Sequence, residues 1–280
     1  MMHIRVIKYL MPLTGFLFIV CGCVSTPEKA TVSLTHGLDA SAGDVSCYVL
    51  STATTTYYLE KEGGGLSSML DVDGMDWLGF HNEEGSGWKG EYRGFPNSIH
   101  KQDGSYFHAL NAGTEVSTSV VEIESDDHVR IVFTSGNGKW KGSWDFYPDR
   151  CDFTMSEVSP GYQYWVLYEG VPNGEMNESD FWYSSADDKA HLIAEKQVGD
   201  LPGPEWIAFG DANAPRMIYL LHHEDDNHPD EYFERPFMTV FGFGRSDKGK
   251  FMDTPQTFSI GFIESSNYEE IELAIQSVLR

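Results

Sequence analysis

Cysteine is scarce in this sequence. Four cysteines occur among 280 residues, and only Cys47 and Cys151 lie beyond position 23. Neither belongs to a Cys-x-x-Cys or Cys/His pattern, which argues against a zinc site and against a cysteine nucleophile. The two thiols either form one disulfide, as an oxidising compartment allows, or stay free and buried. The sequence leaves these alternatives open.

Positive charge is also scarce. Lys and Arg total 19 against 43 Asp and Glu, which gives a formal net charge of −24. Long-range repulsion by such a chain opposes binding to nucleic acid and to anionic lipid surfaces. We therefore expect no nucleic-acid partner, and we expect an acidic glycan to bind only where basic residues gather at one place.

The motifs of several enzyme classes are missing. The chain has no G-x-S-x-G, no phosphate-cradling G-x-x-x-x-G-K-[ST], no G-x-G-x-x-G ahead of a helix and no H-E-x-x-H. The sequence therefore gives no support to a nucleotide cofactor, and no cofactor is predicted from motifs.

Long apolar runs are absent except at the N-terminus. Leu10–Val20 follows the basic residues Arg5 and Lys8, as in an export signal, and it is too short to cross a bilayer as a stable helix. The residues that follow, VCGC, resemble the bacterial lipobox, in which a small residue precedes the lipidated cysteine. The resemblance implies that Cys23 becomes the mature N-terminus and carries lipid.

This N-terminus predicts how the chain is organised and where it resides. We expect a lipoprotein signal peptide over residues 1–22, a flexible polar tether over residues 23–44 and one domain over residues 45–280. The lipid would anchor the protein to a bilayer of the bacterial cell envelope, at the outer membrane or on a periplasmic face. An ordinary secreted protein is the alternative.

Most of the remaining chain alternates apolar and polar residues as strands do. In HVRIVFTS, for example, Val129, Ile131 and Phe133 share one face. Only residues 267–280 read as a helix, with Asn267 as its N-cap and Ile271 and Ile275 on one face. Many short strands with almost no helix predict an all-β fold, a large two-sheet antiparallel β-sandwich with a short C-terminal helix.

Glu60–Phe80 carries a more specific pattern. Its sequence is EKEGGGLSSMLDVDGMDWLGF, with a glycine break, a Ser-Ser step and a turn of the form D-x-x-G-x-D-W. This resembles the opening hairpin of galactose-mutarotase-like domains, which occur in sugar epimerases, polysaccharide lyases and glycoside hydrolases. The resemblance implies that fold and a carbohydrate ligand. It carries no catalytic histidine or glutamate over to this chain.

The first candidate site is GSGWKGEYRGFPNSIHK, residues 85–101, where cations gather in an otherwise acidic chain. If the ligand is a uronate, Arg93 and Asn97 are expected to neutralise its carboxylate. His100 or Tyr92 is expected to act as base, with Tyr92 as proton donor. Sugar rings are expected to stack on aromatic side chains. The expected substrate-binding residues are Trp88, Lys89 and Trp140. A glycine-rich structural loop is the alternative reading of this stretch.

The second candidate is YLLHHEDDNHPDEYFERP, residues 219–236. His222 and His223 are consecutive, so in a strand they point to opposite faces and do not form a zinc pair. We expect His223 to be a general acid or base whose pKa the neighbouring carboxylates raise. The alternatives are an oxygen-rich calcium site and a solvated acidic loop. The calcium site would use Asp225, Asp226, His228, Asp230 and Glu231.

The third candidate is YQYWVLYEG, residues 162–170. Alternation places Tyr162, Tyr164 and Tyr168 on one face, where packing is the favoured role, and Glu169 on the other. Glu169 ends the strand before a long loop and is expected to pair with a histidine as the second acid/base group.

These residues together predict a carbohydrate-active envelope lipoprotein. The favoured activity is β-elimination on a uronic-acid-containing polysaccharide. In it Arg93 and Asn97 neutralise the carboxylate, His100 or His223 removes the proton, and a tyrosine such as Tyr92 donates one. The alternative is a non-catalytic glycan-binding lipoprotein. The prediction requires that Arg93 and His223 converge over the same face of a sheet.

Overall fold

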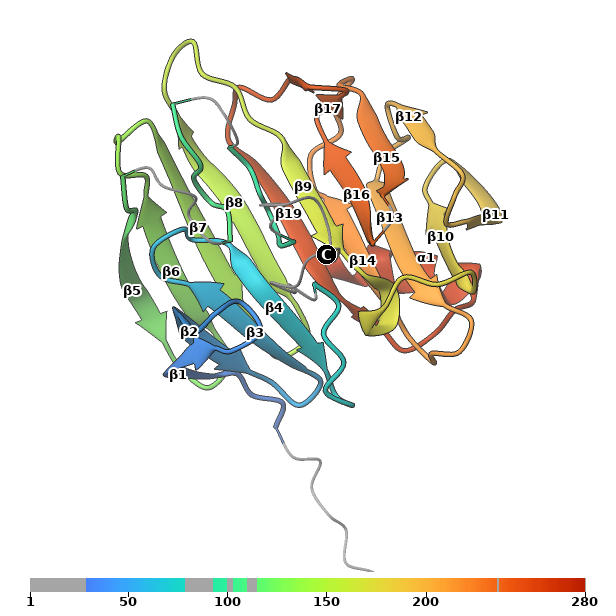
Figure 1. The fold of residues 1–280 in the computed structure, drawn as a ribbon, viewed down its shortest axis with the longest axis horizontal. Coiled ribbons are helices and arrows are strands. Elements are labelled where there is room, and N and C mark those ends of the chain that lie inside the picture. The colour runs from blue at the N-terminus through green and yellow to red at the C-terminus, as the bar shows by residue number, and fades with distance from the viewer. Residues whose placement is uncertain (1–28, 79–92, 100–102, 110–114, 236, 280) are drawn as a thin grey trace, which may run out of the picture.

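The computed structural model of the chain describes residues 29–78, 93–99, 103–109, 115–235 and 237–279. Strands dominate this part of the chain, and every ladder between its strands is antiparallel. They stack as two layers around one hydrophobic core (Figure 1). The predicted large antiparallel β-sandwich is confirmed.

The first layer is one nine-stranded sheet with the order β11-β10-β13-β14-β19-β8-β7-β6-β5. In chain order its strands are β5 (Thr118–Glu124), β6 (Val129–Thr134), β7 (Trp140–Phe146), β8 (Cys151–Val158), β10 (Asp180–Ser184), β11 (Asp187–Leu192), β13 (Glu205–Asp211), β14 (Met217–His222) and β19 (Gln256–Ile263).

The second layer holds two four-stranded sheets, ordered β1-β2-β3-β4 and β12-β15-β16-β9. Their strands are β1 (Ser33–Asp39), β2 (Val45–Ser51), β3 (Thr55–Glu60), β4 (Leu66–Asp71), β9 (Val166–Gly170), β12 (Gln197–Gly199), β15 (Asp230–Arg235) and β16 (Met238–Phe243). Phe95 pairs with Leu66 of β4, and Gly94 pairs with Glu169 of β9, so this segment joins the two sheets. Part of the first candidate site is thus built into the layer.

Three small elements lie outside these three sheets. They are the 3-10 turn η1 (Pro172–Gly174) and the two-residue strands β17 (Arg245–Ser246) and β18 (Gly249–Lys250). β17 and β18 form a hairpin directly after β16.

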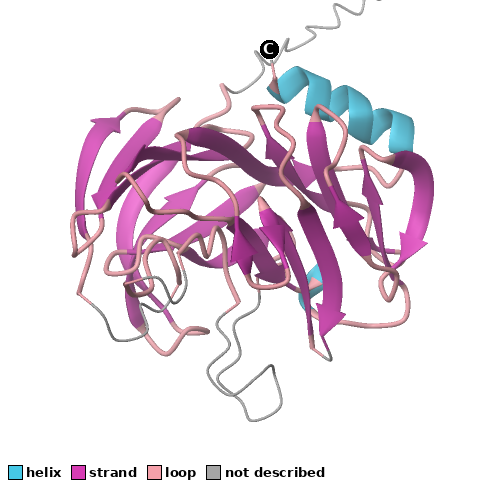
Figure 2. Cartoon of the chain, turned by 90° about the horizontal axis from the view of Figure 1, so that it is seen from above, coloured by secondary structure: helices cyan, strands magenta, loops and turns pink. Residues whose placement is uncertain are grey.

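Helix α1 (Tyr268–Val278) covers the far face of the nine-stranded sheet (Figure 2). Asn267 caps it by accepting a hydrogen bond from the backbone N–H of Glu270 at 3.2 Å, as predicted. Ile271 and Ile275 are its buried residues. No helix among the described residues is long and apolar enough to cross a membrane.

The helix explains why β14 is apolar on both faces. Ile218 and Leu220 belong to the core between the layers, whereas Tyr219 and Leu221 pack in the separate cluster that contains α1. The same alternation continues to the end of the strand. It places His222 on the inner face and His223 on the outer face.

The expected tether over residues 23–44 needs a correction. Residues 33–39 form β1, which pairs with β2 along its whole length. At its end the buried Asp39 carboxylate accepts hydrogen bonds from Ser67 at 2.5 Å and Ser68 at 2.7 Å. The segment is polar because β1 is an edge strand with one exposed face, and not because it is free of the sandwich.

The D-x-x-G-x-D-W motif closes the β4 turn. The Asp71 carboxylate accepts hydrogen bonds from the backbone N–H groups of Asp73 and Met75 and from Trp77 Nε1 at 3.0 Å. Gly74 has φ of 82°, a backbone conformation that glycine adopts without strain. The motif that carries the family resemblance therefore stabilises the turn after β4.

Cys47 and Cys151 are free and buried, so the structure has the free-thiol alternative. Burial raises the pKa of the Cys47 thiol to about 12, and burial also raises the pKa of Cys151. Neither thiol is therefore a ready nucleophile.

Candidate functional site

Glu169 lies on the outer side of the second layer. Its neighbour Tyr168 stacks on Phe209 in the core, with ring centroids 5.5 Å apart. Alternation then turns Glu169 away from the core, as predicted. In register with it stand Val240 of β16 and Phe233 of β15. We call this outer surface of β9, β16 and β15 the β9 face.

Asn97 and Glu169 form the centre of the β9 face. The backbone of Gly94 pairs with Glu169, which brings Asn97 beside β9. Asn97 Nδ2 donates a hydrogen bond to Glu169 Oε2 at 2.7 Å. Asn97 has φ of 39°, in the left-handed region that asparagine tolerates better than most residues. Two of the predicted site residues, which the sequence did not pair with each other, are thus in direct contact.

The carboxyl of Glu169 has an unusual pKa. Burial raises the pKa of Glu169 to about 7, although the Asn97 hydrogen bond and the positive charge of Arg245 lower it. Desolvation therefore outweighs both stabilising contacts. A carboxyl that titrates near neutral pH is suited to general acid or base catalysis.

Cations and aromatic rings gather on the β9 face, and one of the cations, Arg245, acts on Glu169. The Arg245 guanidinium lies 4.7 Å from the centroid of the Phe233 ring and 5.4 Å from that of Trp165. Lys250 Nζ lies 4.3 Å from the same Trp165 ring, and Arg235 lies over Phe233 at 5.7 Å. In a chain with a net charge of −24, three cations on one face are a local concentration of positive charge, and Arg245 among them also pairs with Glu231 at 3.3 Å.

Arg93 is placed differently from the prediction. It is buried, and Nη2 donates a hydrogen bond to the backbone carbonyl of Phe237, at the end of the β15–β16 hairpin. Burial lowers the pKa of Arg93, with weaker opposing contributions from Tyr168 and Asp76. Its guanidinium therefore ties the segment after residue 92 to the second layer.

His223 lies on the opposite side of the molecule from Asn97 and Glu169. His222 stacks on Phe258 in the core, with ring centroids 4.6 Å apart, so His223 faces outward from the nine-stranded sheet. There His223 Nε2 contacts Ser259 Oγ at 2.6 Å, and Ser259 Oγ donates to Asp152 at 2.5 Å. The predicted convergence of Arg93 and His223 over one face is wrong.

The expected direction of the His223 pKa is wrong as well. Burial lowers the pKa of His223, and the nearby carboxylates of Asp152 and Glu224 only partly oppose it. Neighbouring charges are visible in the sequence, whereas the desolvation of His223 depends on its burial in the folded chain.

Trp140 is the other residue that needs a correction. Its side chain is 1% exposed and packs against Tyr106 and Tyr162 in the core, so no sugar ring reaches it. The remaining predicted residues lie outside the described part of the chain. They are Cys23, Trp88, Lys89, Tyr92 and His100.

The acidic stretch does not assemble the calcium ligands expected from it. Asp230 is buried and accepts hydrogen bonds from the backbone N–H groups of Leu201 and Gly244, whereas Glu231 pairs with Arg245 at 3.3 Å on the other side of β15. Asp226 instead lies near Asp200 and Glu205, and their carboxylate oxygens fall within 4.8 Å of one another. Glu205 is already engaged by His222 and by the backbone N–H of Asp226.

This chain resembles known proteins in structure and not in sequence. No protein-family model and no curated protein sequence matches it. The crystal structure of HI1317 matches with a TM-score of 0.54 and 14% identity, over 83% of this chain and 99% of that one. The X-ray structure of a galactose mutarotase related enzyme from Lactobacillus acidophilus matches with a TM-score of 0.48 and 10% identity, over 79% and 99% of the two chains.

The match to HI1317 defines the class of protein by its architecture. The chain is a large antiparallel β-sandwich that shares its fold with HI1317. The large antiparallel β-sandwich predicted from the sequence agrees with the match to HI1317. At these identities the likeness concerns the fold alone, and the activity has to be argued from the site.

Proposed function

We propose that this protein is a carbohydrate-active lipoprotein of the bacterial cell envelope that cleaves a uronic-acid-containing glycan by β-elimination on the β9 face. The observation that carries the proposal is Glu169, a carboxyl with a pKa of about 7 that Asn97 holds at 2.7 Å beside Arg245. The cations of the β9 face support an acidic ligand. The mutarotase-like resemblance of residues 60–80 supports a carbohydrate, by analogy only.

The reaction assigns a separate role to each group. Ionised Glu169 removes the proton from the carbon next to the uronate carboxyl, while Arg245 binds that carboxylate and offsets the developing negative charge. The carbon–oxygen bond to the leaving sugar breaks as a carbon–carbon double bond forms. The leaving oxygen takes a proton from Tyr92 or His100. Asn97 keeps the Glu169 carboxylate in position.

This assignment changes the roles expected from the sequence. Glu169 replaces His223 as the base, because His223 lies on the other side of the sandwich. Arg245 replaces Arg93 as the partner of the substrate carboxylate, because Arg93 donates to the carbonyl of Phe237.

Elimination leaves an unsaturated sugar that absorbs ultraviolet light, and this property provides the test. Mature protein incubated with a panel of uronic-acid polysaccharides is expected to produce a steady rise in absorbance with at least one of them. Neither absorbance nor new reducing ends with any member of the panel would contradict the proposed reaction.

A non-catalytic glycan-binding lipoprotein is the second candidate. It is favoured by the cations that lie over aromatic rings on the β9 face, because they bind an acidic sugar without any chemistry. Retention of the protein on gels that contain a uronic polysaccharide, without product formation, would support this candidate over the enzyme.

The lipid anchor is tested separately at Cys23. The Cys23→Ser variant, expressed in a bacterial host, is expected to move from the membrane fraction to the soluble fraction and to lose incorporation of a labelled fatty acid. The matched control is Cys47→Ser, because Cys47 is a buried core residue and should keep the label. Equal labelling of Cys23→Ser and the unchanged chain would contradict the anchor.

A further inference from the structure

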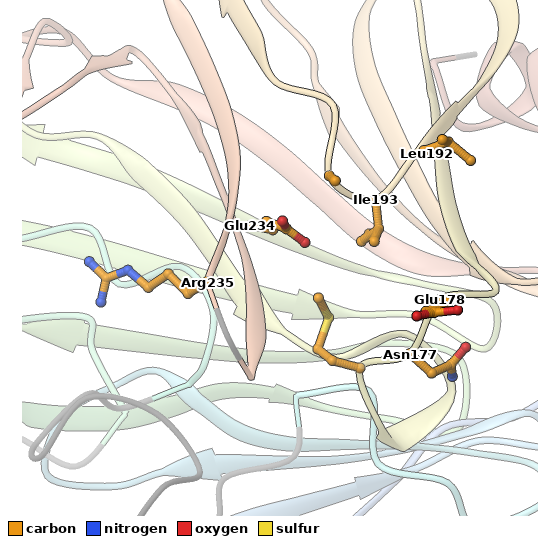
Figure 3. A pocket seen from close by; sticks show the side chains of 8 residues that line it. Asn177, Glu178, Leu192, Ile193, Glu234 and Arg235 are labelled. Atoms are coloured by element: carbon orange, nitrogen blue, oxygen red, sulfur yellow. The ribbon is translucent and has the colours of Figure 1, made fainter.

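A hollow of about 500 Å³ opens at the end of the second layer, beside β15 (Figure 3). We call it the edge hollow. Its volume lies within the range of about 300–1,000 Å³ that is typical of small-molecule sites. Its lining residues are Met176, Asn177, Glu178, Leu192, Ile193, Ala194, Glu234 and Arg235. The roles given to Glu169 and Arg245 above do not use this hollow.

The walls of the edge hollow are held in place by Asp180. This residue is 1% exposed, and its carboxylate accepts a hydrogen bond from the backbone N–H of Asn177 at 2.8 Å. Its backbone carbonyl accepts from the N–H of Ile193 at 3.3 Å. Two opposite walls are therefore tied to one buried residue, so the hollow is formed before any ligand enters it.

The chemistry of the lining selects a neutral, hydroxyl-rich ligand. Glu234 and Ile193 face each other across the hollow, and Glu178 stands at one side (Figure 3). The carboxylates of Glu178 and Glu234 repel an anion, whereas the Arg235 guanidinium points away from the hollow (Figure 3). A sugar hydroxyl both donates and accepts hydrogen bonds, and the apolar face of a sugar ring packs on Met176 and Ile193.

The edge hollow is linked to the β9 face through one aromatic ring. Arg235 lines the hollow and also lies over Phe233 at 5.7 Å, and Arg245 covers the same ring at 4.7 Å. Phe233, Val240 and Glu169 stand in register across three neighbouring strands. Arg245 also lowers the pKa of both Arg235 and Glu169, so its charge acts at both places.

We infer that the edge hollow is a second sugar subsite that takes a neutral residue of the glycan, while the arginines beside Phe233 and Glu169 take an acidic one. The inference rests on the proposed function for the acidic residue. It assigns a substrate class, a polysaccharide in which uronic acid and neutral hexose residues alternate. A glycan built of uronic acid alone would place a carboxylate next to Glu178 and Glu234, and that repulsion would weaken its binding.

The test measures binding of two oligosaccharides of equal length by titration calorimetry. One alternates uronic acid with a neutral hexose, and the other is all uronate. The alternating oligosaccharide is expected to bind about tenfold more tightly, and Glu234→Gln is expected to remove about tenfold of its affinity, as loss of a charged hydrogen bond does. The all-uronate oligosaccharide should bind the variant no more weakly than it binds the unchanged chain.

Two further variants separate an effect at the edge hollow from a general effect of removing a carboxylate. Glu157→Gln makes the same chemical change in an exposed ion pair on another sheet face and should alter neither affinity. Ile193→Trp fills the hollow and should act like Glu234→Gln. Equal affinities of the unchanged chain for the two oligosaccharides, or no effect of Glu234→Gln, would overturn the subsite.

Failure of the proposed function has a different signature. If neither acidic oligosaccharide binds, the acidic site on the β9 face is overturned. Binding of a neutral hexose oligosaccharide is then measured to test the edge hollow by itself. Binding that Glu234→Gln weakens supports the hollow, and lack of binding overturns it.

Discussion

Glu169→Gln is expected to lower kcat for elimination by about 10²–10⁴-fold, the usual contribution of a general acid or base. The amide keeps the size of the side chain, and its carbonyl still accepts the hydrogen bond that Asn97 donates to Glu169 in the unchanged chain. What is lost is the ability to take a proton. The measurement is the initial rate of ultraviolet absorbance with a saturating uronic polysaccharide.

The pH dependence gives a second readout of the same residue. Because burial raises the pKa of Glu169 to about 7, the rate should rise as pH passes through about 7 and level off above it, where the base is ionised. The residual rate of Glu169→Gln should lack this inflection. A rate that falls through the same pH range would mean that Glu169 acts as an acid.

As pH rises through about 7, the contribution of Glu169 to stability falls while its contribution to activity rises. The pKa of Glu169 is higher in the folded chain than the value of about 4.3 in the unfolded chain, so folding favours the protonated carboxyl. This contribution is complete below pH about 4.3 and is lost as pH rises through about 7. At pH 8, Glu169→Gln should therefore have a Tm equal to or above that of the unchanged chain, so lost activity cannot be attributed to unfolding.

Two control variants locate the site. Glu157→Gln removes an exposed carboxylate paired with Lys141 and should leave the rate unchanged. His223→Asn should also leave the rate unchanged, since His223 contacts Ser259 on the outer side of the nine-stranded sheet. Loss of activity in His223→Asn with full activity in Glu169→Gln would place the chemistry on the opposite face.

The fold was predictable because its signals are local. The alternation that put Val129, Ile131 and Phe133 on one face is correct, and all three side chains are fully buried. The C-terminal helix was equally legible from its cap and its apolar spacing. Each signal depends on neighbours a few residues away, which a sequence displays directly.

The same patterns did not predict which face of a strand points into the core. Trp140 was expected to bind a sugar, but the face that it shares with Trp144 is turned into the core and not toward a ligand. His222 and His223 do point to opposite sides, yet only the position of β14 inside a sheet covered on both faces decides which side is which. Alternation along a strand determines which side chains share a face. Which of the two faces points into the core depends on how the strand is buried between the layers.

Arg245 was missed because nothing near it in the sequence points to Glu169. The two residues meet only because β16 pairs with β9 and the chain then turns into β17. One local sign exists: a side chain at Gly242 would clash with Leu167 and with the Arg245 stem, so this glycine makes room for the arginine. A glycine with that role is recognisable only once the strand register is known.

The largest effect on stability is expected from Arg216→Met. Arg216 Nη1 donates to the buried Asp71 carboxylate at 2.7 Å and to Asp73 at 2.7 Å, and Nε donates to Glu264 at 2.9 Å. Arg216 precedes β14 in one layer and Asp71 ends β4 in the other, so the ion pair joins the two layers. Removing the cation leaves a buried charge unpaired, which costs about 3–5 kcal/mol of unfolding free energy.

Thermal unfolding measures this loss, with a fall in Tm of about 2–4 °C for each kcal/mol in a domain of this size. The matched control is Arg130→Met, which removes a partly exposed arginine from Asp145 while His128 remains as a partner of that carboxylate. It should cost no more than about 1 kcal/mol. Equal losses in the two variants would show that Asp71–Arg216 does not join the layers.

Acid titration separates the ion pair from simple packing by Arg216. Burial by itself would raise the pKa of Asp71, but the hydrogen bonds from Trp77 and Arg216 outweigh it, and the pKa is lowered. The stability that Asp71 contributes is therefore present above its unfolded pKa of about 3.9 and is lost as pH falls through the folded value. Arg216→Met should flatten this loss of Tm on acidification. If the variant keeps the full acid dependence, the arginine stabilises the sandwich through its apolar stem and not through its charge.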